Sequence, residues 1–177
     1  MSAKSLRSLD ICVAKREIAI GGSDGNVYFL DLDTFDVKQT IKTAHTNSVF
    51  SVRYTPDGKH LVTGGRDAFL KLWPLDSPPD SLGTSPYFSL FEAPAHLFTV
   101  NSIAFHPLNP ILFATASRDR TIKIWEIQDT TLFLRKVVDT IRYGCHIRSV
   151  NSLFWSTFND YLVSVSDDRS VIVWKIS

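Results

Sequence analysis

The chain has 177 residues, of which 44% are hydrophobic, and its 19 basic residues nearly balance its 18 acidic ones. This composition is typical of a globular protein with a sizeable core and argues against disorder over most of the length. The even charge balance provides no basic surplus for neutralising phosphates, so nucleic acid is not an expected partner.

Two cysteines, Cys12 and Cys145, stand far apart in dissimilar surroundings. They cannot build a disulfide framework and lack the spacing of zinc ligands, so we expect both to be small buried or half-buried side chains. The opening MSAKSLRSLD contains no apolar run of signal-peptide length, and no window approaches the ~18 apolar residues of a membrane span. We expect a cytoplasmic protein with no membrane partner.

In chain order, the residues predict short strands and no helix. The first unit begins with SLRSLDICV, an inner strand, and continues through IAIGGSDGNVYFL to the run DVKQTIKTAH. The second opens with the alternating, β-branched SVFSVRY, and the turn TPDGKH leads to LVTGG and FLKLW, which flank the short turn RDA. HPLNP and STFND are the corresponding first turns of the third and fourth units. Frequent turn signals without a 3.6-residue period predict an all-β array with four strands per unit.

These units are copies of one pattern. Three segments align without gaps: HTNSVFSVRY (45–54), HLFTVNSIAF (96–105) and HIRSVNSLFW (146–155). A second set aligns equally well: LVTGGRDAFLKLW (61–73), FATASRDRTIKIW (113–125) and LVSVSDDRSVIVW (162–174), with a weaker first copy at 18–30. Their aspartates, Asp24, Asp67, Asp119 and Asp168, recur every 43, 52 and 49 positions. That period is typical of a β-propeller blade. We expect one propeller segment over 1–177, with repeats at approximately 5–45, 46–96, 97–146 and 147–177.

The repeated histidines, turn aspartates and tryptophans carry a specific resemblance. The chain resembles WD40-repeat proteins, which are radial β-propellers with four-stranded blades. Where that family often has Gly-His and Trp-Asp, this sequence has Ala-His or Cys-His, and then Trp-Pro, Trp-Glu or Trp-Lys. The resemblance extends over almost the whole chain and implies four propeller blades.

A hydroxyl, a carboxylate and a histidine in the third unit, Thr115, Asp119 and His96, have the residue types of a catalytic triad. The same spacing recurs in the second and fourth units, which a catalytic site does not need. A buried indole N–H requires an acceptor, and a hydroxyl–histidine–aspartate chain supplies one. The resemblance implies a structural tetrad in each of three units. The sets are His45, Thr63, Asp67 and Trp73; His96, Thr115, Asp119 and Trp125; and His146, Ser164, Asp168 and Trp174.

The first unit departs from this pattern, because Ile20 stands at the hydroxyl position and Leu30 at the tryptophan position. Replacing both ends of a buried hydrogen-bond chain together is nearly neutral. We therefore expect this blade to form through apolar burial.

The fourth unit offers three strands, ending with SVIVWKIS, and the start of the chain offers no matching outer strand. Three arrangements account for an incomplete ring. The chain is the C-terminal part of a seven-bladed propeller with missing N-terminal blades, or a half-propeller that pairs with itself or with another half, or a self-closing four-bladed ring. The first is favoured, since a clasped propeller would end after this strand.

Function in a propeller lies in the loops rather than the core. The resemblance implies that partners dock on the face that carries the histidine and aspartate loops. The candidate positions are Arg66, Arg118 and Asp167 before the aspartates, Asn47, Phe98 and Arg148 after the histidines, and Phe50, Asn101 and Asn151 at the channel mouth. Arginines and aromatic residues dominate binding hot spots. We expect a non-enzymatic scaffold for a protein or peptide with some acidic character.

The insertion PLDSPPDSLGTSP (74–86) predicts a mobile loop, a tolerated extension or a second contact site on the opposite face. A propeller enzyme that uses channel residues is the remaining alternative. The inner strands offer mostly Ser, Asn, Val and Phe, and His60 and His106 lack a metal-ligand spacing. Without a phosphate loop or a carboxylate pair, we expect no catalytic residue, no metal and no cofactor.

Overall fold

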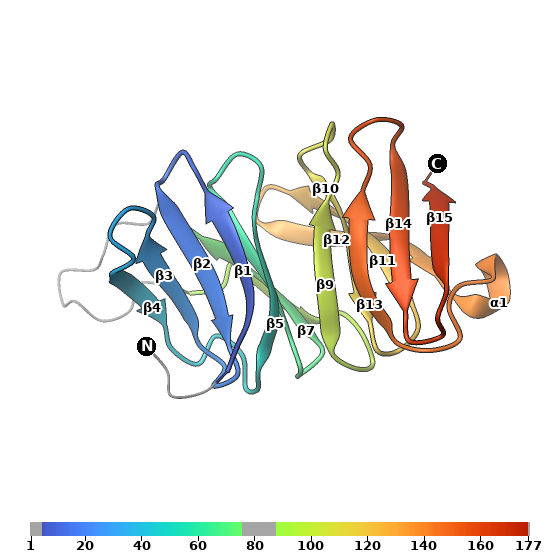
Figure 1. The fold of residues 1–177 in the computed structure, drawn as a ribbon, viewed down its shortest axis with the longest axis horizontal. Coiled ribbons are helices and arrows are strands. Elements are labelled where there is room, and N and C mark those ends of the chain that lie inside the picture. Colours follow the sequence, from blue (N-terminus) through green and yellow to red (C-terminus); the bar gives the residue numbers. More distant parts are fainter. Residues whose placement is uncertain (1–4, 76–87, 177) are drawn as a thin grey trace.

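The computed structural model describes residues 5–75 and 88–176, and these form four antiparallel sheets that follow one another along the chain (Figure 1). We number the sheets as blades. Blade 1 is β1 (Leu6–Cys12), β2 (Glu17–Gly22), β3 (Val27–Asp31) and β4 (Val37–Ile41). Blade 2 is β5 (Val49–Tyr54), β6 (His60–Gly65), β7 (Phe69–Pro74) and β8 (Phe91–Pro94). Blade 3 is β9 (Val100–Phe105), β10 (Leu112–Ser117), β11 (Ile122–Gln128) and β12 (Thr131–Val138). Blade 4 is β13 (Val150–Trp155), β14 (Tyr161–Ser166) and β15 (Val171–Lys175).

Within each blade the strands pair in chain order, which is the meander that the turn signals predict. The predicted all-β fold is confirmed. Three blades have four strands and the fourth has three, as its sequence indicates.

One helical turn, α1 (Thr140–Tyr143), lies between β12 and β13, so the expectation of strands alone is wrong here. It is held by local caps rather than by packing, since none of its residues is buried. Asp139 accepts a hydrogen bond from the Arg142 backbone N at 2.8 Å, and Gly144 ends the turn at a φ of 64°. A turn without a buried face produces no apolar periodicity, which explains why the sequence pattern did not reveal it.

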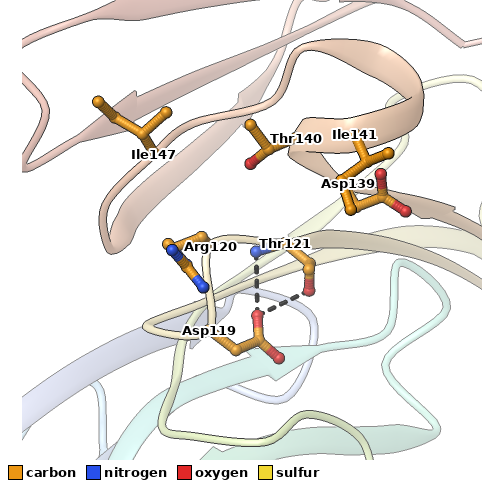
Figure 2. Close-up of a pocket in the computed structure, with 7 residues that line it drawn as sticks. All are labelled: Asp119, Arg120, Thr121, Asp139, Thr140, Ile141 and Ile147. Carbon is orange, nitrogen blue, oxygen red and sulfur yellow. Dashed lines mark hydrogen bonds between the residues drawn. The ribbon is translucent and has the colours of Figure 1, made fainter.

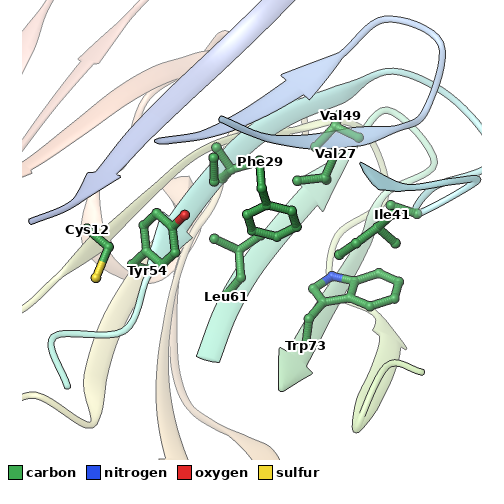
Figure 3. Packing of buried hydrophobic residues seen from close by; sticks show 11 residues of the cluster. Cys12, Val27, Phe29, Ile41, Val49, Tyr54, Leu61 and Trp73 are labelled. Carbon is green, nitrogen blue, oxygen red and sulfur yellow. The ribbon is translucent and has the colours of Figure 1, made fainter. Parts of the chain in front are cut away.

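The core lies between the blades. The inner strand of each following blade packs on the first two strands of the blade before it. In the first of these contacts, Val49, Val52 and Tyr54 of β5 bury their side chains against blade 1, where they meet Val27 and Phe29 (Figure 3). Two similar clusters join blades 2 and 3 and blades 3 and 4.

Two glycines allow this close approach. A Cβ on Gly21 would lie 2.9 Å from Val49 Cγ1, and one on Gly64 would lie 2.6 Å from Val100 Cγ1. Real Cβ atoms do not come this close to neighbouring carbon atoms, so glycine is required where the next blade inserts its valine. In blade 3 the equivalent residue is Ala116, which is buried in the same cluster as Val150.

The four blades form an open row, with blades 1 and 4 at opposite ends of the molecule in Figure 1. Each end therefore has a sheet face without a neighbouring blade among the described residues. The predicted loop 74–86 lies almost wholly outside the described residues, apart from Pro74 and Leu75. Both cysteines are buried and free, as expected. None of the described helical residues forms a span long and apolar enough to cross a membrane.

Candidate functional site

A hydrogen-bond chain runs through the interior of blade 3. The Trp125 Nε1–H donates to Thr115 Oγ1 at 2.9 Å, and the threonine oxygen lies 2.8 Å from His96 Nε2. His96 Nδ1 lies 2.9 Å from Asp119 Oδ2. Because a carboxylate only accepts, Nδ1 carries the proton, so Nε2 accepts from the threonine hydroxyl. Every polar side-chain atom in this series of hydrogen bonds has a partner, as buried polar atoms require.

The other two sets have the same geometry. In blade 2 the three distances are 2.9 Å (Trp73–Thr63), 2.7 Å (Thr63–His45) and 2.9 Å (His45–Asp67). In blade 4 they are 2.9 Å (Trp174–Ser164), 2.8 Å (Ser164–His146) and 3.0 Å (His146–Asp168).

Each aspartate also holds two loops together. Asp119 accepts from the Leu97 backbone N and the Thr121 backbone N, both at 3.0 Å, so it joins the loop after the histidine to its own tight turn. Burial alone would raise the pKa of Asp119, but the hydrogen bonds from His96 and Thr121 outweigh it and hold the pKa well below its usual range. Burial lowers the pKa of His96, in keeping with a neutral ring.

The hydroxyls of the three sets have no access to solvent. Thr63, Thr115 and Ser164 are each 0% exposed. A nucleophile must reach its substrate, so these hydroxyls brace their blades and take no part in surface chemistry.

Blade 1 uses a different arrangement, in which Ile20 and Leu30 are buried with Tyr28 in a small apolar cluster. The expected apolar replacement is accompanied by a polar contact that sequence reasoning missed. The Tyr28 hydroxyl donates to Asp24 at 2.6 Å, so the turn aspartate of this blade receives a phenol. Tyr28 lies four residues after Asp24, a spacing that could have indicated the contact.

A pocket of about 400 Å³ opens on the loop face between blades 3 and 4. Its lining combines exposed apolar and cationic side chains with few acids. The lining residues are Leu97, Phe98, Arg118, Asp119, Arg120, Arg148, Ser149 and Asp167. We call it the arginine pocket.

A second pocket of about 380 Å³ lies beside it, between the blade 3 turn and α1, and Arg120 lines both. Figure 2 shows Arg120 and Ile147 on one side of this space and Ile141 of α1 on the other. Ile141 is 97% exposed and Ile147 is 65% exposed. The two hollows thus share Asp119 and Arg120, and exposed apolar side chains line each of them.

The predicted partner-binding residues divide into two groups. Phe98, Arg118, Arg148 and Asp167 meet in the arginine pocket, although they come from two blades. The others lie outside its lining and have local or inter-blade contacts. Asn101 Nδ2 donates to Ser149 Oγ and Val150 O, and Asn151 Nδ2 donates to Asp167. Asn47 Oδ1 accepts from the Ser48 backbone N, and Arg7 lies 5.2 Å from the centre of the Phe50 ring. Arg66 is exposed on the turn of blade 2.

Sequence reasoning missed three residues of the pocket, Leu97, Arg120 and Ser149. Arg120 directly follows the tetrad aspartate, at a position where the backbone has a positive φ in all four blades: Gly25 (83°), Ala68 (69°), Arg120 (72°) and Arg169 (67°). Each of these residues has the left-handed backbone conformation in the tight turn that follows its aspartate. The repeat alignment contained that signal, because the position is fixed relative to each aspartate.

The described residues contain no cluster of three or more His, Cys, Asp or Glu side chains with a geometry suited to a metal ion. In the same part of the chain, no buried side-chain polar atom lacks a hydrogen-bond partner.

Comparisons with known proteins identify the repeats. The family model described as "WD domain, G-beta repeat" matches residues 37–74, 88–126 and 136–175. The anaphase-promoting complex subunit cdc20 of Dictyostelium discoideum is 29% identical over 167 residues, covering 89% of this chain and 30% of that protein. The nuclear distribution protein nudF of Emericella nidulans is 31% identical over 165 residues, covering 87% and 35%. DDB1- and CUL4-associated factor 13 of Dictyostelium discoideum is 28% identical, covering 90% and 33%.

The chain thus spans about a third of the length of these relatives. Among solved structures, the computationally designed Ika4 protein superposes with a TM-score of 0.73 at 22% identity, covering 100% of this chain and 94% of that chain. This likeness concerns the fold. Together with three family matches and the three hydrogen-bonded tetrads, it leads to one conclusion: the chain belongs to the WD40-repeat family.

Proposed function

We propose that the chain is a non-enzymatic scaffold whose arginine pocket binds a protein segment that carries both acidic and apolar side chains. One observation carries this proposal. Arg118, Arg120 and Arg148 converge on the pocket, and no ion pair involves any of them among the described residues. Arg135, in contrast, pairs with Glu126, and Arg16 pairs with Asp33. Unpaired guanidinium groups beside a hollow attract carboxylates, which they bind in a bidentate manner.

The apolar residues at the rim define the other half of the partner. Leu97 is 84% exposed and Phe98 is 57% exposed, and both border the three arginines. Such residues are costly to leave in water and favourable to cover, which is why aromatic and arginine side chains contribute most to binding interfaces. Of the acids in the lining, Asp119 is engaged in its tetrad and Asp167 accepts a hydrogen bond from Asn151. The three arginines outnumber the two acids of the lining, so the net charge that the pocket offers to a ligand is positive.

The relatives agree with a role in assemblies. Two of them have names that place them in one, as a subunit of the anaphase-promoting complex and as a factor associated with DDB1 and CUL4. For this chain, we propose a role of the same general kind with a partner of its own. The sealed tetrad hydroxyls support a binding role over a catalytic one.

The test uses an array of short peptides that combine glutamates with leucine or phenylalanine, and matched peptides in which glutamine replaces glutamate. Arg118→Glu combined with Arg148→Glu should abolish binding, with a loss of about 30-fold or more, since hot-spot residues contribute 2 kcal/mol or more. The matched control is Arg135→Glu combined with Arg169→Glu, which changes the same charge away from the pocket. Equal loss in both pairs, or equal binding of the glutamine peptides, would contradict the proposal.

A further inference from the structure

A hydrogen bond that recurs at every contact between blades fixes how one blade docks on the next. Ser8 Oγ accepts from the Val52 backbone N at 3.1 Å, Ser51 Oγ from Ile103 N at 3.1 Å, and Ser102 Oγ from Leu153 N at 3.2 Å. Ser152 is the fourth residue of this series. It is exposed on blade 4, at the face toward which a following blade would dock.

A second shared hydrogen bond shows which residues of the four inner strands correspond to one another. The backbone N of the residue before each turn aspartate donates to the backbone O of Ser5, Ser48, Thr99 or Ser149. Counting three residues on from these positions gives Ser8, Ser51, Ser102 and Ser152. Leu6 of blade 1 therefore corresponds to Val49, Val100 and Val150, the residues that each blade inserts into the preceding one.

We call the side of a blade that receives the next one its forward face, and the opposite side its rear face. The forward face of blade 4 is apolar and open. Val165, Val171 and Val173 are 37%, 64% and 59% exposed, and they correspond to Gly64, Leu70 and Leu72, which are buried against blade 3. This exposed apolar face has the same residue positions that are buried at the three internal contacts. It therefore indicates a docking surface.

The rear face of blade 1 is open as well, but it does not fit the forward face of blade 4. The inserted residue meets a glycine or an alanine at each internal contact: Val49 meets Gly21, Val100 meets Gly64, and Val150 packs with Ala116. If blade 1 of a second copy docked on blade 4, Leu6 would meet Val165. Leu6 is larger than the valines that are inserted at the internal contacts, and Val165 is larger than the glycine or alanine that receives them. At the contact between blades 2 and 3, even a single Cβ on Gly64 would lie 2.6 Å from Val100 Cγ1.

We propose that the forward face of blade 4 binds a WD40 blade whose inner strand has glycine or alanine where this chain has Leu6. That blade supplies a backbone N–H for Ser152 and leaves room for Val165. The Val165–Leu6 pair makes the two ends of the chain reject each other, so two identical copies do not close into a ring. Specificity arises from a clash built against the wrong partner as well as from contacts with the right one. This inference concerns the end of the blade row and is independent of the arginine pocket.

The experiment measures the affinity between two variants of the full chain. In each variant one end face is closed by arginine, so that the two can associate only through one contact between blades. The donor variant carries Leu9→Arg, which closes its rear face and leaves the forward face of blade 4 free. The acceptor variant carries Val171→Arg and Val173→Arg, which close its forward face and leave its rear face free. Donor and acceptor are titrated by calorimetry, with the acceptor either retaining Leu6 or carrying Leu6→Ala in addition.

We expect the L6A acceptor to bind about tenfold or more tightly than the acceptor with Leu6, because relief of overpacking outweighs the lost apolar area. The matched control is Ile11→Ala in the acceptor, which removes apolar area elsewhere on the same face and should weaken binding. As a second route, Val165→Gly in the donor should strengthen binding to the acceptor with native Leu6, even if L6A is poorly folded. Equal or tighter binding with Leu6 and Val165 both native, or no binding by any folded pair, overturns the proposal.

Discussion

The hydroxyl group of Thr115 is the hydrogen-bond partner of two buried side chains. Trp125 donates to its oxygen and His96 accepts its proton, and the side chain is 0% exposed. Replacing it with valine keeps the shape and removes the hydroxyl, which leaves a buried indole N–H and a buried imidazole nitrogen without partners. We expect Thr115→Val to lower the free energy of unfolding by about 1–3 kcal/mol, measured by denaturant titration.

Thr115→Ser provides the control, because it keeps the hydroxyl and loses only a methyl group. It should be the more stable of the two variants. The tetrad interpretation is wrong if Thr115→Val is as stable as the serine variant, since the hydroxyl would then contribute nothing.

At this scale the repeat alignment predicted which residues would meet, because a position that recurs in three blades has the same neighbours in each. His96, Thr115, Asp119 and Trp125 recur in this way, and the resemblance to WD40-repeat proteins implied that they form a tetrad. Residues whose type varies between blades were not: the position of Arg120 is held by Gly25, Ala68 and Arg169 in the other blades, and the bond from Tyr28 to Asp24 belongs to blade 1. The alignment fixes the position of each of these residues relative to its aspartate, but the contact that the side chain makes there depends on which residue type that blade has.

The blades themselves are joined through small residues in their second strands. Gly64 on β6 faces Val100 on β9, and a Cβ there would lie 2.6 Å from Val100 Cγ1 and 2.8 Å from Val100 Cβ. We expect Gly64→Ala to destabilise the protein by about 1–3 kcal/mol through overpacking, measured as a fall in the denaturation midpoint. Gly64 has no positive φ, so the loss comes from the contact and not from backbone strain.

Combining Gly64→Ala with Val100→Ala isolates this contact. The double variant should be less destabilised than the sum of the two single variants, because Val100→Ala makes room for the new Cβ and that Cβ fills part of the space left by the valine. Strictly additive losses would show that the crowding is relieved elsewhere and would weaken the argument about Val165 and Leu6.

The elements were predictable where a pattern imposes them. Alternating residues and tight turns predicted the strands of every blade. The helical turn α1 was not predicted, because Asp139 and Gly144 cap it locally and none of its residues is buried. It nevertheless matters for the site, since Ile141 projects from it toward the hollow beside Arg120.

The whole molecule is a row in which each blade contacts only its neighbours, so stability is a sum of blade and interface contributions. Blades 2 and 3 have neighbours on both sides, whereas blade 4 has one covered face among the described residues. The difference is visible in corresponding strands. Most residues of β10 are buried, but exposed and half-buried residues alternate along β15.

Hydrogen exchange followed by mass spectrometry should therefore resolve a gradient along the row. Amides of β6, β10 and β11 should exchange most slowly, because opening them requires both flanking contacts to be disrupted. Amides of β15 should exchange faster than those of β7 and β11, the corresponding strands of blades 2 and 3, since β15 pairs only with β14 whereas each of those strands is paired on both sides. Adding the L6A acceptor should slow exchange in β13 and β14, where the incoming strand packs, while leaving β6 unchanged. Uniform protection across all four blades would instead mean that the chain opens as one cooperative unit, and that its end faces are already covered in solution.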